Sequence, residues 1–457
     1  MSMSGNREVD VVVIGLGVGG EHLSTRLAEG GCTVVGIEAH LVGGECPYYG
    51  CVPTKMIVRA ANVLEEARRV DALAGTTTVA PDWGVVARRI RKDATDNWDD
   101  GVAVKRLEDA GVQVVRGRGR LVARDRVRVG DDEFVATRAV VIASGTEPAV
   151  PGIDGLDAVP YLTNRDMVAL EQLPTSLLVM GGGAIGLELA QATRRFGVHV
   201  TVVEAADRLA FREEPEVSAL LTDVFEDEGI DVRVGANVER VSGDDREVTL
   251  HLADGNEVVG ERLLVCTGRR SDLRALGVGA AGLDEDARVI SVDEHLRAAP
   301  GVYAIGDVTG VGAFTHVAAY HARIAAAEIL GRPTHPAETG AIPRVTYTDP
   351  EVGAVGMTEA EAHEHGVDVA IGHADSSDSA RGWMHAEGNA ELVKLVVDRK
   401  EEVLVGATVA GPMGGEVLSM LVLAVHARIP IPTIRSMIFA YPTFHRTIES
   451  ALDSLPA

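Results

Sequence analysis

The sequence has no excess of positive charge, no long hydrophobic run and few cysteines. Its formal net charge of −25 would repel phosphates, which argues against a general binder of nucleic-acid backbones. No apolar stretch approaches the roughly 20 residues that span a bilayer, and the longest, around Val417–Val425, stops at His426 and Arg428. The N-terminal segment MSMSGNREVD lacks the basic and then apolar layout of a signal peptide. These absences predict a cytoplasmic protein that binds neither nucleic acid nor membrane.

The four cysteines include one close pair, Cys46 and Cys51, in the segment GGECPYYGCVPTK at 43–55. Such a pair can staple a loop, hold a metal or carry electrons. Cytoplasmic thiols are normally kept reduced, so a catalytic or metal-binding role is favoured over a permanent staple. A metal site is disfavoured in turn, because no CxxC, HxxH or second close cysteine pair accompanies the two thiols. Cys32 and Cys266 stand beside expected core strands and read as small hydrophobic side chains.

Length and composition indicate a multidomain α/β protein. A chain of 457 residues is too long for one ordinary core and suggests two or three domains. A hydrophobic fraction of 46% and 51 glycines are typical of a soluble globular chain rather than a disordered or fibrous one.

A short apolar run, Val9–Ile14, leads directly into a glycine-rich turn, GLGVGG at 15–20. A helical pattern follows over Glu21–Glu29, and a second apolar strand, Thr33–Ile37, ends in Glu38. This order of strand, GxGxxG turn, helix, strand and acid is the fingerprint of a dinucleotide site. The glycines let the backbone approach a pyrophosphate at the helix N-terminus, and the acid is placed to accept hydrogen bonds from a ribose. The candidate cofactor-binding residues are Gly15, Gly17, Gly20 and Glu38.

The same pattern recurs about 165 residues later. Ser176–Met180 is an expected strand, GGGAIG at 181–186 is the turn, Leu187–Phe196 is the helix, and the next strand, His199–Val203, ends in Glu204. Two fingerprints imply two dinucleotides, or one internal duplication that binds two cofactors. An acid at this strand end disfavours a 2′-phosphate, and no arginine follows before Arg208, so NADH is expected rather than NADPH. The candidate residues here are Gly181, Gly183, Gly186 and Glu204.

Several further motifs follow in order along the chain. They are the Cys46–Lys55 stretch, Ala143-Ser144-Gly145-Thr146, Val302-Tyr303-Ala304-Ile305-Gly306-Asp307, and a block that opens at Thr348-Asp349-Pro350-Glu351-Val352-Gly353. With the two glycine turns, this series makes the whole chain resemble the flavoprotein pyridine nucleotide–disulfide oxidoreductases, the family of glutathione reductase, dihydrolipoamide dehydrogenase and mercuric reductase. The resemblance implies an α/β fold with two doubly wound Rossmann-like dinucleotide-binding domains and a C-terminal α+β dimerisation domain.

The same resemblance implies FAD at the first turn and a nicotinamide nucleotide at the second. The FAD-binding domain would comprise 1–150 and 271–335, the NAD(P)-binding domain 151–270, and the interface domain 336–457, which builds a two-fold homodimer. Asp307 would bind the ribityl chain of FAD. Further cofactor contacts are implied for Gly44, Lys55, Gly119, Ser144, Gly145, Val238, Gly268 and Thr315.

In the family, the cysteine pair is a redox-active disulfide, here Cys46–Cys51. Pro53 suits the first turn of a helix, which puts Cys51 near a helix N-terminus where thiolate is favoured over thiol. Lys55 shares that helix face, and the matching lysine of the family approaches the flavin and pairs with an acid that corresponds to Glu188. The implied electron path runs from NADH through FAD to Cys51, and then from Cys46 to a small-molecule acceptor.

The C-terminal segment FAYPTFHRTIESAL departs from the family. Disulfide reductases of the family usually carry a His-Pro there, with a Glu five residues after the His, and this chain has Tyr441 and Arg446 at those positions. Tyrosine, with a pKa of about 10, is a poor general base at neutral pH. His445 and Glu449 lie four apart and could form a substitute dyad on one helix face, or an ordinary surface pair. Mercuric reductases also carry tyrosine at this position, but their extra C-terminal cysteine pair is missing here.

The residues between the two cysteines depart as well. Pro47, Tyr48 and Tyr49 are bulkier than the small or amide-bearing residues usual in the family. They could narrow access to Cys46, stack on a planar substrate or pack against the FAD-binding domain.

The sequence leaves three functions open. The leading one is an NADH-dependent, FAD-containing oxidoreductase that cycles through Cys46–Cys51 and reduces a disulfide, a metal ion or another small acceptor. A diaphorase-like quinone reductase would not need the cysteines. A redox-sensing binding flavoprotein would show negligible turnover.

Overall fold

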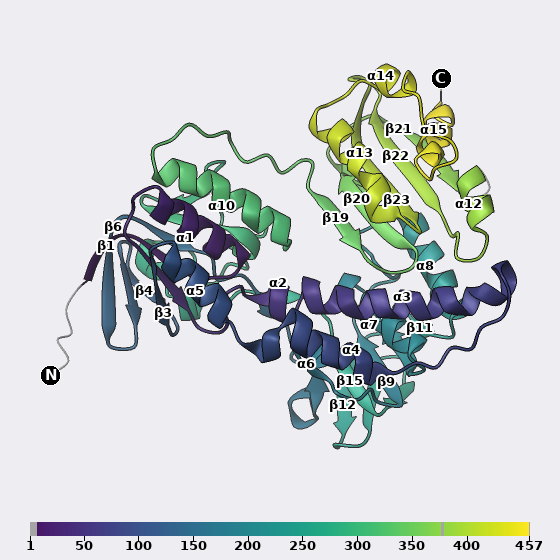
Figure 1. Cartoon of the computed structure of the whole chain (residues 1–457), viewed down its shortest axis with the longest axis horizontal. Helices are drawn as coiled ribbons and strands as arrows, with labels where there is room; N and C mark the ends of the chain where they lie inside the picture. The colour runs from purple at the N-terminus through teal and green to yellow at the C-terminus, as the bar shows by residue number, and fades with distance from the viewer. Residues whose placement is uncertain (1–6, 376–378, 457) are drawn as a thin grey trace. The chain divides into compact units, whose positions relative to one another are not determined.

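The computed structural model of the chain describes residues 7–375 and 379–456. The extreme chain ends, on which the predictions about a signal peptide and a C-terminal cysteine pair partly rest, lie outside these residues. The chain divides into two compact units, one of Met1–Pro53, Arg88–Ala149 and Arg269–Thr339, the other of Thr54–Ala87, Val150–Gly268 and Gly340–Ala457. Each unit therefore joins segments that are far apart in the sequence (Figure 1). The four domain ranges expected from the sequence stay a prediction.

The first unit is built on an eight-stranded sheet whose central strands are parallel. Strand β1 (Arg7–Ile14) lies between β2 (Val34–Glu38) and β6 (Asp132–Ile142), in the order β17-β18-β6-β1-β2-β3. A hairpin of β4 and β5 pairs with β6. The bounds of these other strands are β3 (Val112–Arg116), β4 (Arg120–Ala123), β5 (Arg126–Val129), β17 (Arg297–Ala299) and β18 (Val302–Ala304).

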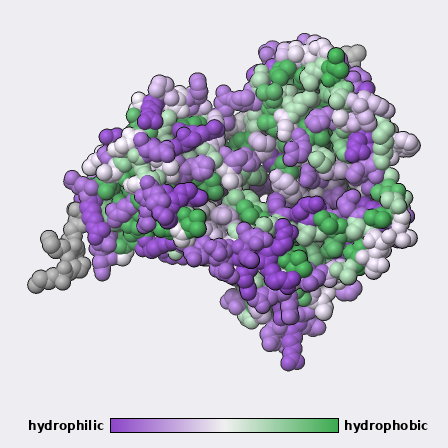
Figure 2. Space-filling view, viewed as in Figure 1, coloured by the Kyte–Doolittle hydropathy of each residue, from purple (hydrophilic) through white to green (hydrophobic). Residues whose placement is uncertain are grey.

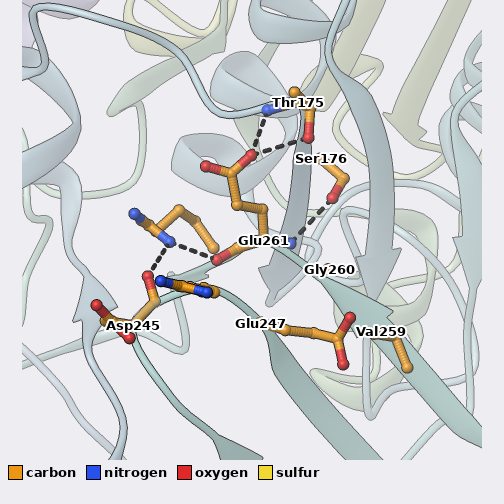
Figure 3. A pocket seen from close by; sticks show the side chains of 9 residues that line it. Thr175, Ser176, Asp245, Glu247, Val259, Gly260 and Glu261 are labelled. Carbon is orange, nitrogen blue, oxygen red and sulfur yellow. Dashed lines mark hydrogen bonds between the residues drawn. The ribbon is translucent and has the colours of Figure 1, made fainter.

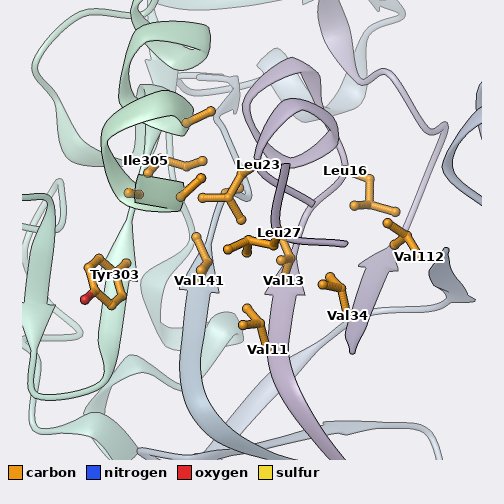
Figure 4. Close-up of a cluster of buried hydrophobic side chains, with 14 of the residues drawn as sticks. Val11, Val13, Leu16, Leu23, Leu27, Val34, Val112, Val141, Tyr303 and Ile305 are labelled. Carbon is orange, nitrogen blue, oxygen red and sulfur yellow. The ribbon is translucent and has the colours of Figure 1, made fainter. Parts of the chain in front are cut away.

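Both faces of the central strands are buried, which explains why their sequences are continuously apolar. Val13 points into one core together with Leu23 of α1 (Val18–Glu29) (Figure 4). Ile14 belongs to the second core cluster, on the other face. Helix α10 (Thr315–Ile329) lies alongside α1 (Figure 1). Further elements of this unit are α2 (Glu45–Tyr48), α5 (Gly101–Asp109), α9 (Leu273–Leu276) and the strand pair β7 (Glu147–Pro148) and β16 (Arg269–Arg270).

The second unit contains a five-stranded parallel sheet in the order β11-β10-β9-β15-β8. Its central strands β9 (Ser176–Met180) and β10 (His199–Val203) have the bounds predicted from the sequence. A three-stranded antiparallel sheet, β12-β13-β14, belongs to the same segment. The other bounds are β8 (Tyr161–Leu162), β11 (Asp231–Arg233), β12 (Val238–Gly243), β13 (Val248–Leu252), β14 (Glu257–Gly260), β15 (Arg262–Val265), α6 (Asn164–Ala169), α7 (Ala184–Arg195) and α8 (Pro215–Asp227). Most residues of α3 (Cys51–Leu73) and α4 (Trp83–Arg89) also belong to this unit, whereas residues 51–53 and the last two residues of α4 belong to the first.

The C-terminal part of the second unit is an antiparallel sheet in the order β19-β20-β23-β22-β21. Helix α13 (Gly414–His426), which contains the longest apolar run, packs on β20 and β23, and α15 (Arg446–Asp453) packs on β21 and β22. Within residues 7–375 and 379–456, none of the helices combines the length and the apolar character needed to span a bilayer. The remaining bounds are β19 (Pro343–Thr346), β20 (Glu351–Gly356), β21 (Val369–Asp375), β22 (Leu392–Asp398), β23 (Val403–Gly411), α11 (Glu359–Glu364), α12 (Ala380–His385) and α14 (Ile431–Arg435).

This architecture is the predicted one: two parallel-sheet α/β folds and a C-terminal α+β domain. The two helices that follow the glycine turns, however, begin three residues earlier than the sequence predicts. Helix α1 begins at Val18 rather than Glu21, and α7 begins at Ala184 rather than Leu187. The last glycine of each turn is already helical, because its missing side chain lets the first helical turn pack on the strand end.

Candidate functional site

The first glycine turn joins β1 to α1, and its glycines differ in how close an added Cβ atom would lie to neighbouring atoms. At Gly15, where φ is 96°, an added Cβ would lie 2.4 Å from the carbonyl oxygen of Ala143. At Gly20 it would lie 2.0 Å from the carbonyl oxygen of Gly15, so both positions require glycine for the turn to close. At Gly17, the N-cap of α1, the nearest atom would be 3.9 Å away. The turn thus leaves open space beside the first N–H groups of a helix, which fits a pyrophosphate.

The second glycine turn, between β9 and α7, repeats these relations. An added Cβ at Gly181 would lie 2.4 Å from the carbonyl oxygen of Cys266, and one at Gly186 would lie 2.1 Å from the carbonyl oxygen of Gly181. At Gly183, the N-cap of α7, an added Cβ would meet no atom within 4 Å. The second turn therefore offers the same open cradle for a pyrophosphate.

The two acids at the strand ends are also held alike. The buried carboxylate of Glu38 accepts hydrogen bonds from the backbone N–H groups of Leu16 at 2.7 Å and His40 at 2.8 Å. Glu204 accepts from the backbone N–H of Gly182 and, at 2.7 Å, from that of Ala206. In each case one donor is the second residue of the turn, so the acid is fixed against the phosphate cradle. A carboxylate in that place is suited to a ribose diol.

Asp307 lies just beyond the end of β18, in the same sheet as the first turn. It accepts a hydrogen bond from the Thr146 hydroxyl at 2.9 Å. Burial raises the pKa of Asp307, against the lowering effects of this hydrogen bond and of the Arg269 charge. Arg269 donates to the hydroxyl of Thr146 at 2.8 Å and to its carbonyl at 2.6 Å. Thr146 is the last residue of the Ala143–Thr146 motif noted in the sequence, whereas no sequence motif pointed to Arg269 as part of this site.

Three other predicted cofactor contacts lie at strand ends or starts. An added Cβ at Gly119 would lie 3.2 Å from the side chains of Ile14 and Ile37, at the carboxyl ends of β1 and β2. Gly268 follows β15 with φ of 121°, and an added Cβ there would meet no atom within 4 Å. Val238 begins β12 and is half-buried.

The segment that carries Cys46 is attached to the first glycine turn. Gly43 pairs with Gly17 in a β-bridge, and an added Cβ at Gly44, where φ is 69°, would lie 2.8 Å from the Cα of Gly17. Cys46 then lies on α2 and is half-buried. The ring of Tyr48 is buried in the first unit, so one of the two tyrosines packs against the domain.

Cys51 is the first residue of α3, as the position of Pro53 predicted. Its sulfur lies 3.4 Å from the hydroxyl of Thr315, which is the first residue of α10. Cys51 is exposed. Two predicted site residues are thus neighbours at two helix N-termini, where the helix macrodipoles favour a negative charge.

Lys55 and Glu188 form an ion pair in the second unit. The Lys55 ammonium lies 2.6 Å from a carboxylate oxygen of Glu188, which is 4% exposed. The other oxygen of that carboxylate accepts a hydrogen bond from the backbone N–H of Tyr347 at 2.9 Å. The ring of Tyr347 lies 4.7 Å from the ammonium. Sequence reasoning missed Tyr347, although it directly precedes the Thr348–Gly353 block.

The C-terminal residues form a different set of contacts from the dyad considered above. Glu449 makes its ion pair with Arg446, at 2.6 Å. The Arg446 guanidinium lies 5.3 Å from the ring centre of Tyr441, whose side chain is exposed. His445 is the N-cap of α15 and is half-buried. The carboxylate that the sequence offered to His445 is therefore engaged by arginine.

Of the two remaining cysteines, Cys32 lies in a core of the first unit, whereas Cys266 is half-buried directly after β15. Cys32 is buried just before β2, and burial raises its pKa. Burial raises the pKa of Cys266, which follows β15, to about 12. Both thiols are therefore protonated at neutral pH and unsuited to exchange.

A polar hollow of about 570 Å³ opens elsewhere in the second unit, beside β14 and β15 (Figure 3). Glu261 in its wall accepts hydrogen bonds of 2.8 Å from the backbone N–H and the hydroxyl of Thr175. Arg262 donates to the carbonyl oxygens of Asp245 and Glu261. These groups satisfy one another, and the lining contains none of the predicted site residues.

Comparison with known proteins agrees with this geometry along the whole chain. Residues 9–322 match the model of the pyridine nucleotide-disulphide oxidoreductase family, and residues 342–452 match the dimerisation domain of the same family. The dihydrolipoyl dehydrogenase of Chlorobaculum tepidum is 33% identical over 98% of this chain and 97% of its own length. The mercuric reductase of Streptomyces lividans is 33% identical over 97% of this chain and 96% of its own length.

Solved structures extend the comparison. The Cu(II) complex of the HOCl-induced flavoprotein disulfide reductase RclA from Escherichia coli matches with a TM-score of 0.85 at 26% identity, over 98% of this chain and 99% of that chain. LpdA from Mycobacterium tuberculosis matches with a TM-score of 0.84 at 26% identity and the same coverage. The chain therefore belongs to the pyridine nucleotide-disulphide oxidoreductase family and is an oxidoreductase that uses FAD and a pyridine nucleotide and carries the family's dimerisation domain.

Proposed function

We propose that the chain is an NADH-dependent reductase of a thiophilic metal ion, Cu(II) or Hg(II), with Cys46 and Cys51 as the electron donors. The observation that carries the proposal is the C-terminal cluster at Tyr441. Exchange with an organic disulfide needs a base that takes and returns a thiol proton. Here a phenol stands at that position, and Arg446 engages the nearby carboxylate of Glu449. A metal ion bound by thiolates accepts electrons without that proton transfer, so the chemistry favours it as the acceptor.

Each cysteine has a separate role in this proposal. Cys51 heads α3, where the macrodipole favours thiolate, and the nearby Thr315 hydroxyl can donate a hydrogen bond to it. Cys46 would bind the metal ion as a thiolate. Oxidation of the two thiolates to the Cys46–Cys51 disulfide releases two electrons, which reduce two Cu(II) ions to Cu(I) or one Hg(II) ion to the metal.

Bound FAD would take hydride from the pyridine nucleotide and return the electron pair to the disulfide. The open space at Gly17 supports assignment of the pyrophosphate to the first turn, and the fixed carboxylate of Glu38 supports assignment of the ribose. Asp307 is assigned to the ribityl chain. Its pKa is raised by burial, as expected of a carboxyl group that hydrogen-bonds in a polar but dry site.

Lys55 is assigned as the positive group that faces the reactive end of the bound cofactors. The carboxylate of Glu188 lies 2.6 Å from its ammonium, and the backbone N–H and ring of Tyr347 hold both members of the pair in one arrangement. Such a fixed cation would stabilise negative charge that develops during the reaction.

The choice of NADH over NADPH rests on two side chains of the second turn. The carboxylate of Glu204 would repel a 2′-phosphate and accept from a 2′-hydroxyl. Arg208, the nearest following arginine, is occupied by its own loop: it donates to the carbonyl oxygens of Phe211 and Glu213, each at 2.7 Å.

Relatives support a metal ion as the acceptor. Mercuric reductases of Bacillus cereus and Streptomyces lividans match nearly the whole chain, and RclA is known in a Cu(II) complex.

The proposal includes a cytoplasmic homodimer. Large apolar side chains are exposed on the C-terminal domain, and Figure 2 shows hydrophobic surface there. They include Trp383, Met384, Met437, Ile438 and Tyr441. Such a concentration of exposed apolar groups is suited to a second copy of the chain. The cytoplasm supplies NADH and keeps thiols reduced.

The test is NADH oxidation by the holoenzyme with Cu(II), Hg(II), lipoamide, glutathione disulfide and a quinone as acceptors. We expect turnover with a metal ion to exceed that with the organic disulfides, and to fall to background in Cys46→Ser and Cys51→Ser. Cys266→Ala is the matched control, because that thiol is buried and protonated. Faster turnover of lipoamide or glutathione disulfide would contradict the metal assignment. Full quinone turnover in the double serine variant would indicate a diaphorase, and negligible turnover with every acceptor would indicate a redox sensor.

A further inference from the structure

The segment 205–214, between β10 and α8, forms a wall of the second glycine turn. The backbone N–H of Ala210 donates to the carbonyl oxygen of Gly182 at 2.8 Å. An added Cβ at Gly182 would lie 3.0 Å from the side chain of Leu209, so segment and turn are in close contact. The same Gly182 donates its N–H to Glu204, the acid assigned to the ribose. Movement of this segment would therefore change the turn and its acid together.

Arg208 organises the segment from within. Its guanidinium donates to the carbonyl oxygens of Phe211 and Glu213, and at 3.0 Å to the hydroxyl of Ser218 in α8. That hydroxyl donates in turn to the carbonyl oxygen of Leu209 at 2.5 Å. The segment is thus tied to itself and to the start of α8, and its outer end is the pair Glu213 and Glu214.

The dimerisation domain holds this outer end through two basic side chains. Arg344 of β19 lies 2.8 Å from the carboxylate of Glu213. Lys394 in the middle of β22 is 3% exposed and lies 3.0 Å from Glu214, which is itself buried. Glu216 and Glu359 each lie 2.8 Å from the same ammonium.

The electrostatics of this cluster oppose its separation. Burial alone would lower the pKa of Lys394, but the hydrogen bonds that its ammonium donates to Glu216, Glu359 and Glu214 outweigh burial and raise the pKa. The pKa of Glu216 is lowered despite its partial burial, because Lys394 donates to it. A buried ammonium that loses these partners would be left without compensation, which is costly. The end of the segment is therefore fixed to the dimerisation domain rather than merely near it.

We propose that Arg344 and Lys394 are positioning residues for the pyridine nucleotide, through which the dimerisation domain sets the nucleotide affinity of the second turn. The inference rests on the assignment of that turn to the nucleotide. The path of contacts runs from Arg344 and Lys394 to Glu213 and Glu214, through the 205–214 segment, and from Ala210 to Gly182. Neither basic residue touches the glycine turn, so their effect acts on binding through the segment.

The test reverses and then exchanges one ion pair, in the FAD-loaded full chain. Arg344→Glu and Glu213→Arg should each raise the Kd for NAD⁺, measured by calorimetry on the oxidised enzyme, by about tenfold, a change that corresponds to roughly 1.4 kcal/mol of binding free energy. The KM for NADH should rise in parallel, while kcat with ferricyanide changes little. The exchanged variant Glu213→Arg/Arg344→Glu should recover most of the affinity. Arg399→Gln is the matched control, because Arg399 forms an exposed ion pair with Asp368 in the same domain.

Unchanged Kd values in both reversal variants would overturn the inference, as would a fall in kcat at constant Kd. Failure of the exchanged variant to recover affinity would also overturn it, because a structural disturbance alone is not repaired by swapping charges. If a reversal variant loses FAD, Arg344→Gln replaces it and should still weaken NAD⁺ binding. Ferricyanide and NAD⁺ involve neither the metal ion nor the cysteines, so failure of the metal-reductase proposal leaves this test intact.

Discussion

Acidification is expected to weaken the fold at His321, beside the segment that carries Asp307. The imidazole is completely buried on α10, and its Nδ1 accepts a hydrogen bond from the backbone N–H of Gly306 at 3.2 Å. Among the described residues its Nε2 has no hydrogen-bond partner. Burial lowers the pKa of His321 from 6.5 to about 4, because the charged ring would be desolvated.

The sign and size of the effect follow from proton binding. In the unfolded chain the pKa returns to about 6.5, so the unfolded state binds more protons between about pH 6.5 and pH 4. Stability is therefore present above pH 6.5, decreases as the pH falls through this window, and reaches its full loss below pH 4. A difference of about 2.5 pKa units corresponds to roughly 3 kcal/mol, of which roughly 2 kcal/mol is already lost at pH 5.

The assay is urea unfolding of the holoenzyme at pH 7.5 and pH 5, followed by FAD fluorescence, which reports on the first unit under the FAD assignment proposed above. His321→Asn retains an acceptor for the Gly306 N–H but has no titrating ring, so it should lose about 2 kcal/mol less between the two pH values than the wild type. His199→Asn, at an exposed position at the start of β10, controls for removal of a titrating histidine. Equal losses in the wild type and in His321→Asn would refute the reasoning.

Two further substitutions probe the site directly. Tyr347→Leu removes the ring beside Lys55, a contact worth about 0.5–1 kcal/mol, so enzyme reduction by NADH in a stopped-flow experiment should slow roughly two- to fivefold, whereas Tyr347→Phe should stay near wild type. Equal rates in the Leu and Phe variants would show that the ring has no such role. The methyl group added by Gly17→Ala would lie no closer than 3.9 Å to another residue, so the melting temperature should change little, whereas FAD should bind more weakly. An unchanged Kd for FAD would contradict the assignment of the pyrophosphate to this position. Gly20→Ala should fail to fold, because its Cβ would lie 2.0 Å from the Gly15 oxygen.

The strands around the glycine turns were predictable to within a few residues because they are buried on both faces. A continuous apolar run such as Ser176–Met180 has few alternative readings when a glycine turn and a helix follow. The helix starts were not predictable from apolar periodicity, since Val18 and Ala184 belong to helices whose first turns are rich in glycine. Glycine lowers helix propensity in general, and here packing against the strand end overrides it.

Contacts between residues far apart in the sequence could not be predicted from sequence motifs or periodicity. Motif position identified Lys55 and Glu188, but Tyr347 is 159 residues from Glu188 and reaches it through its backbone N–H, which has no sequence signature. Lys394 reads as an interruption in an apolar strand, and its burial depends on carboxylates about 180 residues away. The spacing of His445 and Glu449 suggested that these two side chains interact, whereas in the structure Glu449 forms its ion pair with Arg446.

The matching geometry of Glu38 and Glu204 has a consequence for how the protein sorts its ligands. FAD and NADH share an adenosine diphosphate half, and each acid accepts from the second residue of its turn and from the residue two positions after itself. The two acids, held so alike, do not by themselves distinguish the ligands by that common half. Under the assignments proposed above, discrimination would then come from the side chains assigned to the flavin and nicotinamide ends of the cofactors: Asp307, Thr315, Lys55 and Glu188. We therefore expect an adenine nucleotide that carries neither ring to bind at either turn.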